Sequence, residues 1–388
     1  MVPVRYNIRS LFVRKLTTGA TAIGIAMVVF VFAGALMAGE GIKRAMGNAG
    51  RDDIAIVLRD GSDAELSSSV KPEVLGMLRE RPEVARVEGR EGVIGEVVVI
   101  ITAELADGSG GLSNVMIRGT PAGGIEFRPE LKVVRGRAPK PGTNEVMVGR
   151  AISGRFKGIA TGQSFDLRRN RPFQVVGVFE AAGSSYESEV WGDADVIATA
   201  LGRSASVSSA RIRLTSASQF PTFKASLEAD KRLGVEVMRE SDYLKKQSEQ
   251  LQGFLVFMFV AIAVMFSVAA MIGAAITMNG AVANRTREIG TLRALGFSRR
   301  AILFSFVLEA IFLAALGGAV GTAFVLVLTR FQFPIMNFQT FSEIVIGFRA
   351  TPTIMAVSLG FSMIMGLIGG LVPAIRAARV SPVEAMRG

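Results

Sequence analysis

Four long runs of apolar residues divide the chain, and each is long enough to cross a membrane as a helix. We place these spans at residues 17–39, 251–283, 301–329 and 352–375. A helix needs about 20 residues to cross the hydrocarbon core of a bilayer. Glu309 is the only charged residue inside the four runs. The pattern predicts an α-helical membrane protein with four transmembrane helices.

The segment between the first two spans, residues 40–250, has a mixed α/β pattern. Strand-like apolar runs and helical stretches follow one another at both of its ends, each time in the order strand, helix, strand. Turn-rich β segments lie between them. We therefore expect an α/β domain with an inserted β-rich module at about 125–205, and helical extensions at both edges. The expected strands are 54–58, 97–101, 145–148, 173–179, 210–214 and 235–238, and the expected helices are 40–46, 70–81, 220–231 and 239–250.

The second apolar run is longer than a membrane requires. As one helix, its 33 residues would be about 50 Å long, whereas the hydrocarbon core is about 30 Å thick. Tilt could absorb part of the excess. The alternative is a rigid stalk that leaves the membrane and carries motion between the spans and the large domain.

Basic residues are concentrated beside the spans. The net charge is +11, of which residues 1–16 supply +4, residues 284–300 supply +4 and the tail 376–388 supplies +2. Residues 40–250 carry 30 basic and 29 acidic side chains. Because cytoplasmic loops hold the excess of Lys and Arg, we expect both termini in the cytoplasm and the large domain on the opposite side of the membrane. This distribution does not favour nucleic-acid binding.

Two segments beside the spans are expected at the membrane surface. Residues 1–16 are typical of an interfacial helix on the cytoplasmic side. The short external loop 330–351 is rich in phenylalanine, which predicts anchoring at the outer interface or, alternatively, contact with an apolar cargo. A cleaved signal peptide is the alternative for the first span, but its uncharged stretch of about 22 residues exceeds the 7–15 of such peptides.

The chain lacks the residues of several catalytic sites. It contains no cysteine and no histidine, which excludes thiol catalysis, the Ser-His-Asp triad and H-E-x-x-H zinc sites. The P-loop pattern G-x-x-x-x-G-K-[ST] is also absent, so the chain does not bind ATP through such a loop. The spacing of Asp and Glu singles out no site. We expect neither enzymatic activity nor a metal site.

A short amphipathic segment, Asn284–Gly296, lies between the second and third spans. A charged helix in this position belongs in an aqueous loop. On a helix, Ile289, Leu292 and either Leu295 or Ala294 share one apolar stripe, which suits a groove on a partner. The alternative is that the loop carries only topology-setting charge. Gly296 is expected to end the helix and Ser298 to cap the next one.

The same segment and the C-terminus resemble one transporter family. Residues 287–296 read Arg-Glu-Ile-Gly-Thr-Leu-Arg-Ala-Leu-Gly and precede Arg299 and Arg300. Residues 373–379 read Pro-Ala-Ile-Arg-Ala-Ala-Arg, and residues 381–387 read Ser-Pro-Val-Glu-Ala-Met-Arg. These are similar to the coupling segment and the ending of FtsX/MacB-type ABC transporter permeases, which include LolC/LolE-type relatives. The order of one span, a large exported domain and three more spans agrees with that family.

The resemblance implies a role in ATP-driven motion, called mechanotransmission. Permeases of this family dimerise, and a cytosolic ABC ATPase binds each copy at the coupling segment. ATP and Mg²⁺ would then be bound by the partner ATPase, with no cofactor in this chain. Because the chain begins about 16 residues before its first span, we expect the ATPase on a separate polypeptide. The residues expected to couple to the ATPase are Arg287, Glu288, Ile289, Gly290, Leu292, Arg293, Ala294, Leu295 and Gly296.

The resemblance leaves the function open between two classes. The first is a permease subunit, in a homodimer or heterodimer, that exports or extracts a small molecule, peptide, lipid or lipoprotein, with a possible periplasmic adaptor. The alternative is an FtsX-like regulator that transports nothing and activates a periplasmic cell-wall hydrolase. A receptor without any ATPase is a third hypothesis, which the coupling-type segment disfavours.

Two further features lie within the spans. Glu309 is costly in a membrane, and we expect an ion pair or hydrogen bond near the inner interface, with a proton relay as the alternative. Small residues four apart allow helices to approach closely, either within one copy or between two. The small residues in question are Gly317, Gly321, Gly366 and Gly370.

Overall fold

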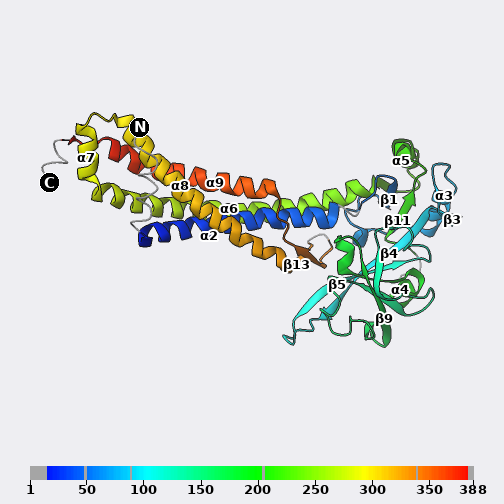
Figure 1. The fold of residues 1–388 in the computed structure, drawn as a ribbon. Helices are drawn as coiled ribbons and strands as arrows, with labels where there is room; N and C mark the ends of the chain where they lie inside the picture. Colours follow the sequence, from blue (N-terminus) through cyan, green and yellow to red (C-terminus); the bar gives the residue numbers. More distant parts are fainter. Residues whose placement is uncertain (1–14, 48–49, 88–89, 203–205, 338–339, 383–388) are drawn as a thin grey trace. The chain divides into compact units, whose positions relative to one another are not determined.

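The structure is a computed structural model, which describes residues 15–47, 50–87, 90–202, 206–337 and 340–382 (Figure 1). The interfacial helix expected in residues 1–16 lies outside the described residues, apart from its last two positions. The chain forms two compact units. The helical unit comprises Met1–Glu40, Gly253–Phe331 and Gly347–Gly388, and the sheet unit comprises Gly41–Gln252 and Gln332–Ile346.

Four helices of the described chain are long and apolar enough to cross a membrane. Two of them extend well beyond the predicted spans, because the polar segments that flank the apolar runs continue the helix without a break. With 45 residues, α6 is about 68 Å long, so tilt alone cannot fit it into a hydrocarbon core of about 30 Å. The helices are α2 (Lys15–Gly47), α6 (Glu240–Asn284), α8 (Arg299–Val325), continued by η4 (Leu326–Arg330), and α9 (Pro352–Ala378).

Small residues bring the helices of the helical unit together. A Cβ atom on Gly317 or Gly321 of α8 would lie 2.7 or 2.5 Å from a carbonyl oxygen of α2. A Cβ on Gly366 or Gly370 of α9 would lie 2.4 or 2.3 Å from an alanine Cβ of α8. Both small-residue motifs therefore make contacts within one chain, where lipid offers no hydrophobic force and close van der Waals packing holds helices together.

The sheet unit is built on a mixed sheet in the order β12-β1-β11-β4-β5-β10-β7-β9-β6, with β8 paired to β9. Each strand and helix expected from the sequence between residues 54 and 238 has a counterpart. The strands are β1 (Ile54–Arg59), β4 (Val93–Glu104), β5 (Leu112–Thr120), β6 (Lys132–Gly136), β7 (Glu145–Gly149), β8 (Ser164–Arg168), β9 (Arg171–Glu180), β10 (Glu189–Asp193), β11 (Ser209–Arg213) and β12 (Val235–Arg239), with a small β2 (Arg86–Val87) and β3 (Arg90–Glu91) pair. The helices are α3 (Pro72–Arg79), α4 (Ala194–Leu201) and α5 (Phe220–Glu228), with 3₁₀ turns η1 (Glu65–Ser67), η2 (Ser185–Ser188) and η3 (Ala217–Gln219).

The β-rich module begins earlier than the expected residue 125, because one long strand serves both halves. The first part of β4 pairs with β11 in the α/β half, and Val97 to Glu104 pair with β5 in the β-rich half. Each half has its own apolar core. A strand of 12 residues reaches across both, so the boundary falls within an element and leaves no linker in the sequence.

The connection between α8 and α9 differs from the predicted interfacial loop. It forms two paired strands, β13 (Gln332–Met336) and β14 (Glu343–Gly347), and most of it belongs to the sheet unit. Ser342 and Ile346 are 1% and 2% exposed. Phe331 and Phe341 remain exposed, and Phe338 lies outside the described residues. The aromatic count indicated an interface, but the alternation of buried positions along β14 reflects packing against the sheet unit.

Candidate functional site: the segment between α6 and α8 and a buried ionic cluster

The segment expected to couple to a partner forms a short helix, α7 (Thr286–Ala294), across one end of the helix bundle (Figure 1). Gly296 has a φ of +91° and ends the helix. The N–H of Phe297 donates to the carbonyl of Leu292 at 3.1 Å, which is the bond of a Schellman motif. Ser298 caps α8 by accepting from the N–H of Ala301. The predicted stop and start signals are confirmed.

The predicted apolar stripe of α7 does not face outward as a whole. Ile289 is 2% exposed and packs with Val282, Ile302 and Phe306 of the helical unit, with Leu292 against the same cluster. Gly290 is also buried. The stripe was predicted to dock on a partner, but its first half is used to seat α7 on its own bundle. Burial of these side chains is favourable wherever an apolar surface is available, and the nearest one belongs to the same chain.

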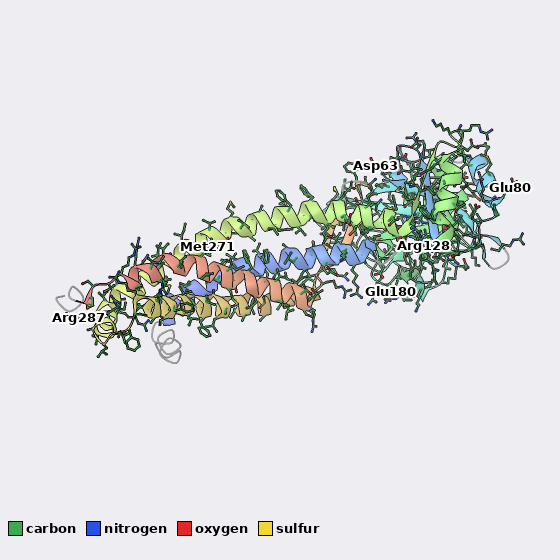
Figure 2. The ribbon with its side chains drawn as sticks, turned by 90° about the horizontal axis from the view of Figure 1, so that it is seen from above. Asp63, Glu80, Arg128, Glu180, Met271 and Arg287 are labelled. Carbon is green, nitrogen blue, oxygen red and sulfur yellow. The ribbon has the colours of Figure 1, made fainter. Side chains whose placement is uncertain are left out.

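The face of α7 that remains in solvent is mixed in character. Leu295 is 73% exposed. Arg287, Glu288, Thr291 and Ala294 are also exposed, and Figure 2 shows Arg287 at the end of the helical unit. Arg293 is half-buried, and its guanidinium donates to the carbonyl of Phe297 at 3.4 Å. This outward face is a candidate docking surface.

An ion pair fixes the start of α7 to α8. Arg285, the residue before α7, donates from Nη1 to Oε2 of Glu309 at 3.0 Å. Both side chains are only about one-eighth exposed, at 12% and 13%. The ion pair expected for Glu309 is therefore present. Because Arg285 lies between the end of α6 and the start of α7, the pair restrains the angle at which α7 leaves α6.

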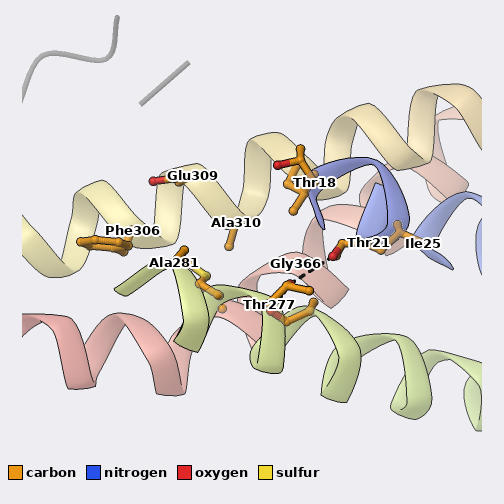
Figure 3. A pocket seen from close by; sticks show the side chains of 13 residues that line it. Thr18, Thr21, Ile25, Thr277, Ala281, Phe306, Glu309, Ala310 and Gly366 are labelled. Carbon is orange, nitrogen blue, oxygen red and sulfur yellow. Dashed lines mark hydrogen bonds between the residues drawn. The ribbon is translucent and has the colours of Figure 1, made fainter. Parts of the chain in front are cut away.

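A small cavity of about 60 Å³ lies beside this ion pair, between the helices (Figure 3). Its wall combines Glu309 with three threonines, and Thr21 of α2 donates to Thr277 of α6 at 3.0 Å. Phe306, Met278 and the small residues of α8 and α9 complete the lining. The polar contacts join α2, α6 and α8 at one level of the bundle.

A second candidate site, a buried ionic cluster, lies on one face of the sheet unit. Three arginines and four glutamates form it, and each is at most 9% exposed in its side chain. They come from η1, four strands, the loop after β5 and the first residue of α6. Figure 2 shows Arg128 among the side chains of this unit. The members are Arg118, Arg128, Arg211, Glu65, Glu96, Glu189 and Glu240.

The ionic cluster is bonded as a network. Arg118 donates to Glu189 at 2.8 Å, to Glu96 at 2.8 Å and to Glu65 at 3.0 Å. Arg211 links Glu65 to Glu240 with two bonds of 2.8 Å and also donates to Glu96. Since the four carboxylates outnumber the three guanidinium groups, neutral donors share the remaining charge. Trp191 donates from Nε1 to Glu189 at 2.8 Å, and Ser209 donates to Glu65 at 2.5 Å.

The arginines keep the carboxylates of Glu96 and Glu65 ionised despite burial. Burial alone raises the pKa of Glu96, but the charges of Arg128, Arg211 and Arg118 outweigh it and lower the pKa to about 2. The same balance holds the pKa of Glu65 well below its usual value. Burial, together with Glu240, raises the pKa of Tyr186 to about 12, so this phenol stays neutral.

The ionic cluster anchors the outer end of α6 to the sheet. Glu240 begins α6, and three residues later Tyr243 accepts a hydrogen bond from the N–H of Glu65 at 3.2 Å. Removing one partner of a buried ion pair costs several kcal/mol, so this attachment resists displacement. The sequence held one signal that we missed: Arg118 and Arg211 alternate with isoleucine in strand-like runs, which indicates a sheet with a charged, buried second face.

Two family models match this chain. The model for the MacB-like periplasmic core domain matches residues 16–230, and the model for the FtsX-like permease C-terminal region matches residues 260–382. The first match takes in the first span and most of the sheet unit, and the second takes in most of α6 together with α7, α8 and α9.

Curated relatives are similar over parts of their length. An uncharacterized ABC transporter permease of Bacillus subtilis, YvrN, is 40% identical over 27% of this chain and 24% of its own length. The pyoverdine export ATP-binding/permease protein PvdT of Pseudomonas entomophila is 31% identical over 56% of this chain and 33% of its own. The chain thus spans about a quarter to a third of these relatives.

A solved structure is similar to part of this chain. The periplasmic region of MacB from Actinobacillus actinomycetemcomitans is 14% identical, with a TM-score of 0.39, over 52% of this chain and 95% of that one. On the family model that covers more than half of its residues, the chain belongs to the MacB/FtsX family of ABC transporter permeases, as a multi-pass membrane protein with a large extracytoplasmic α/β domain between its first two spans.

Proposed function

We propose that this chain is the permease subunit of a bacterial inner-membrane ABC transporter, with α7 in the cytoplasm and the sheet unit in the periplasm. A cytosolic ABC ATPase, which binds ATP and Mg²⁺, docks on the outward face of α7. Its closure moves the helices, and α2 and α6 carry that motion to the sheet unit. A second permease copy completes the transporter, and a periplasmic adaptor is a possible further partner.

The observation that carries this proposal is the construction of α7. Ile289 seats the helix on its own bundle, the Arg285–Glu309 pair fixes its start, and a Schellman motif with a Ser298 cap fixes its end. A segment that only set topology would need charge alone. Here a short helix is held rigidly on three sides while Leu295 stays exposed in solvent, as a partner-binding surface requires.

The continuity of α2 and α6 supports the second step. Neither helix contains proline, the usual cause of a sharp kink, and the first residue of α6, Glu240, belongs to the ionic cluster of the sheet unit. The substrate class is exported or extracted material; relatives named for pyoverdine and macrolide export favour a small molecule over a peptide, lipid or lipoprotein.

An affinity pull-down from membranes tests the docking surface. We expect the tagged wild-type chain to co-purify an ABC ATPase, identified by mass spectrometry, and Leu295→Asp to reduce its recovery at least tenfold, or about 1.4 kcal/mol. A charge placed in an apolar contact is desolvated without a partner. Leu295 does not contact the bundle core, so the variant should insert and fold normally.

Leu112→Asp is the matched control, because Leu112 is 70% exposed, nearly as much as Leu295, and lies in the sheet unit. It should leave ATPase recovery unchanged. If the folded wild type brings down no ATPase, the transporter proposal fails and a receptor role replaces it. If both variants lose the ATPase equally, the docking surface is not on α7.

A further inference from the structure

The hairpin of β13 and β14, here called the α8–α9 hairpin, is covalently tied to both units. The chain leaves the helical unit after Phe331 and returns to it at Gly347, and the residues between belong to the sheet unit. Together with α2 and α6, this gives the sheet unit a third connection to the helices. A simple loop between two spans would need no such attachment, so its contacts indicate what it does.

Glu343 of β14 is the main polar anchor of this hairpin. Its carboxylate accepts from Ser113 Oγ of β5 at 2.6 Å and from Nε of Arg155. The Glu343 side chain is 10% exposed and that of Arg155 is 33% exposed. A carboxylate that receives both a hydroxyl and a guanidinium forms charge-assisted bonds, which are stronger than neutral ones. The residues that it joins are far apart in sequence, so the contact exists only in the folded unit.

Backbone contacts hold the hairpin on either side of Glu343. Asn114 donates from Nδ2 to the carbonyl of Phe341 at 2.8 Å, and the N–H of Val345 donates to Ser188 Oγ at 3.0 Å. Phe341 has a φ of +52°. A bulky residue persists in this left-handed conformation only where its surroundings hold it there.

The hairpin also contributes to the interior of the sheet unit. Val345 packs against the apolar core of the β-rich half. Ser342 and Asn337 are 1% and 4% exposed, and both line a cavity of about 30 Å³ that also borders Arg118 of the ionic cluster. The hairpin is thus held by apolar packing as well as by hydrogen bonds.

We propose that the α8–α9 hairpin is a strap that grips the β-rich half of the domain through Glu343, and that it transmits displacement of α8 and α9 to that half directly. Glu240 fixes α6 to the ionic cluster, whereas Glu343 fixes the hairpin to β5. Polar contacts therefore hold the domain at two separate places, in addition to its covalent connection to α2. This inference rests on the proposed function for its source of motion, but the grip itself stands on the contacts above.

Cysteine labelling of the full chain in membranes tests the grip, because the natural sequence has no cysteine. Ser342→Cys places a thiol at a buried position of the hairpin, and the neighbouring Phe341→Cys places one at an exposed position. With a membrane-impermeant maleimide, we expect Ser342→Cys to react at least tenfold more slowly than Phe341→Cys. Adding Glu343→Ala should accelerate labelling at position 342 about tenfold, or about 1.4 kcal/mol, and leave position 341 unchanged.

Glu73→Ala, which removes an exposed carboxylate of α3, is the control and should change neither rate. If Phe341→Cys and Ser342→Cys react at equal rates in chains that keep Glu343, the grip is overturned. The grip is also overturned if Glu343→Ala leaves the labelling rate at position 342 unchanged while Trp191 fluorescence shows that the variant is folded.

The transmission step is tested in membranes in which a bound ATPase has been demonstrated. Trapping the ATPase with ATP and vanadate should change the labelling rate at position 342 at least threefold, because displacement of α8 and α9 loads the contact between the hairpin and β5 and so changes how often it opens. Leu295→Asp should abolish that change. A rate that stays constant while the ATPase is bound and trapped would overturn the strap as a transmitter. If no ATPase is recovered, the proposed function fails instead. The labelling rates measured without nucleotide still test the grip in that case, so the two failures are distinguishable.

Discussion

Each of the two units of this protein is stabilised internally, and the kinds of contact that do so are opposite. The sheet unit surrounds seven buried charged residues, whereas the helical unit relies on glycines that let helices touch. In the helical unit, Arg285 and Glu309 form a largely buried ion pair, with side chains 12% and 13% exposed, beside the glycine contacts. The difference follows from the solvent: water drives apolar burial in the sheet unit, while lipid provides no such force between helices.

The comparison shows where each unit can yield. Glycine contacts are short and non-directional, so helices can slide against one another at little cost in hydrogen bonds. A buried ionic network is directional, and each arginine satisfies several carboxylates at once. In the sheet unit, which is proposed to receive the force, directional bonds fix the start of α6 to the sheet. In the helical unit, which the ATPase is proposed to move, the contacts between helices permit sliding.

Acid should give the largest difference in stability between the two units. The pKa of Glu96 is about 2 in the folded state against an ordinary 4.5. A lowered pKa stabilises the fold fully above pH 4.5, and this stabilisation is lost as pH falls through the folded value. We expect the sheet unit to unfold between about pH 4.5 and pH 2 while the helices persist. Trp191, the sole tryptophan of the chain, reports the sheet unit by fluorescence, and far-ultraviolet circular dichroism reports the helices. Loss of helix before the tryptophan signal changes would contradict the comparison.

Removing one charge from the ionic cluster should have the next largest effect. Arg211→Met leaves Glu65, Glu96 and Glu240 short of a partner. Breaking a buried pair costs about 3–5 kcal/mol, so we expect a marked fall in the unfolding temperature seen by Trp191 in the detergent-solubilised chain. Arg232→Met, the same change at an exposed ion pair, should cause no measurable shift. Equal effects of the two variants would mean that the ionic cluster does not stabilise the unit.

A methyl group at a glycine contact should have a smaller effect, confined to the helical unit. The Cβ of Gly321→Ala would lie 2.5 Å from the carbonyl oxygen of Ala26, and overpacking of this kind costs about 1–3 kcal/mol. Gly360→Ala in α9 is the control, since no atom lies within 4 Å of its Cβ, and it should stabilise the helix by up to about 1 kcal/mol. The midpoint of thermal helix loss, followed by circular dichroism, checks both. A Gly360→Ala variant that is destabilised as much as Gly321→Ala would show that the loss at Gly321 does not come from its contact with α2.

Local signals determined much of this protein from its sequence. Apolar length located the four membrane helices, because a bilayer imposes a minimum length on any helix that crosses it. Gly296 and Ser298 marked the end of α7 and the start of α8, because capping depends on a few neighbouring residues. The charge distribution and the motif at residues 287–296 indicated the family. The strands and helices of residues 54–238 also followed from periodicity, since each alternates over its own short window.

Only the tertiary structure decided which surfaces face which. An apolar stripe fits the chain's own bundle as well as a partner, so periodicity could not tell that Ile289 is buried and Leu295 exposed. The ionic cluster draws on residues from Glu65 to Glu240, and no spacing along the chain brings them together. The α8–α9 hairpin has the aromatic content of a membrane interface, yet Glu343 attaches it to the sheet unit. In each case, the deciding contacts join residues distant in sequence, and their energies exist only once the chain is folded.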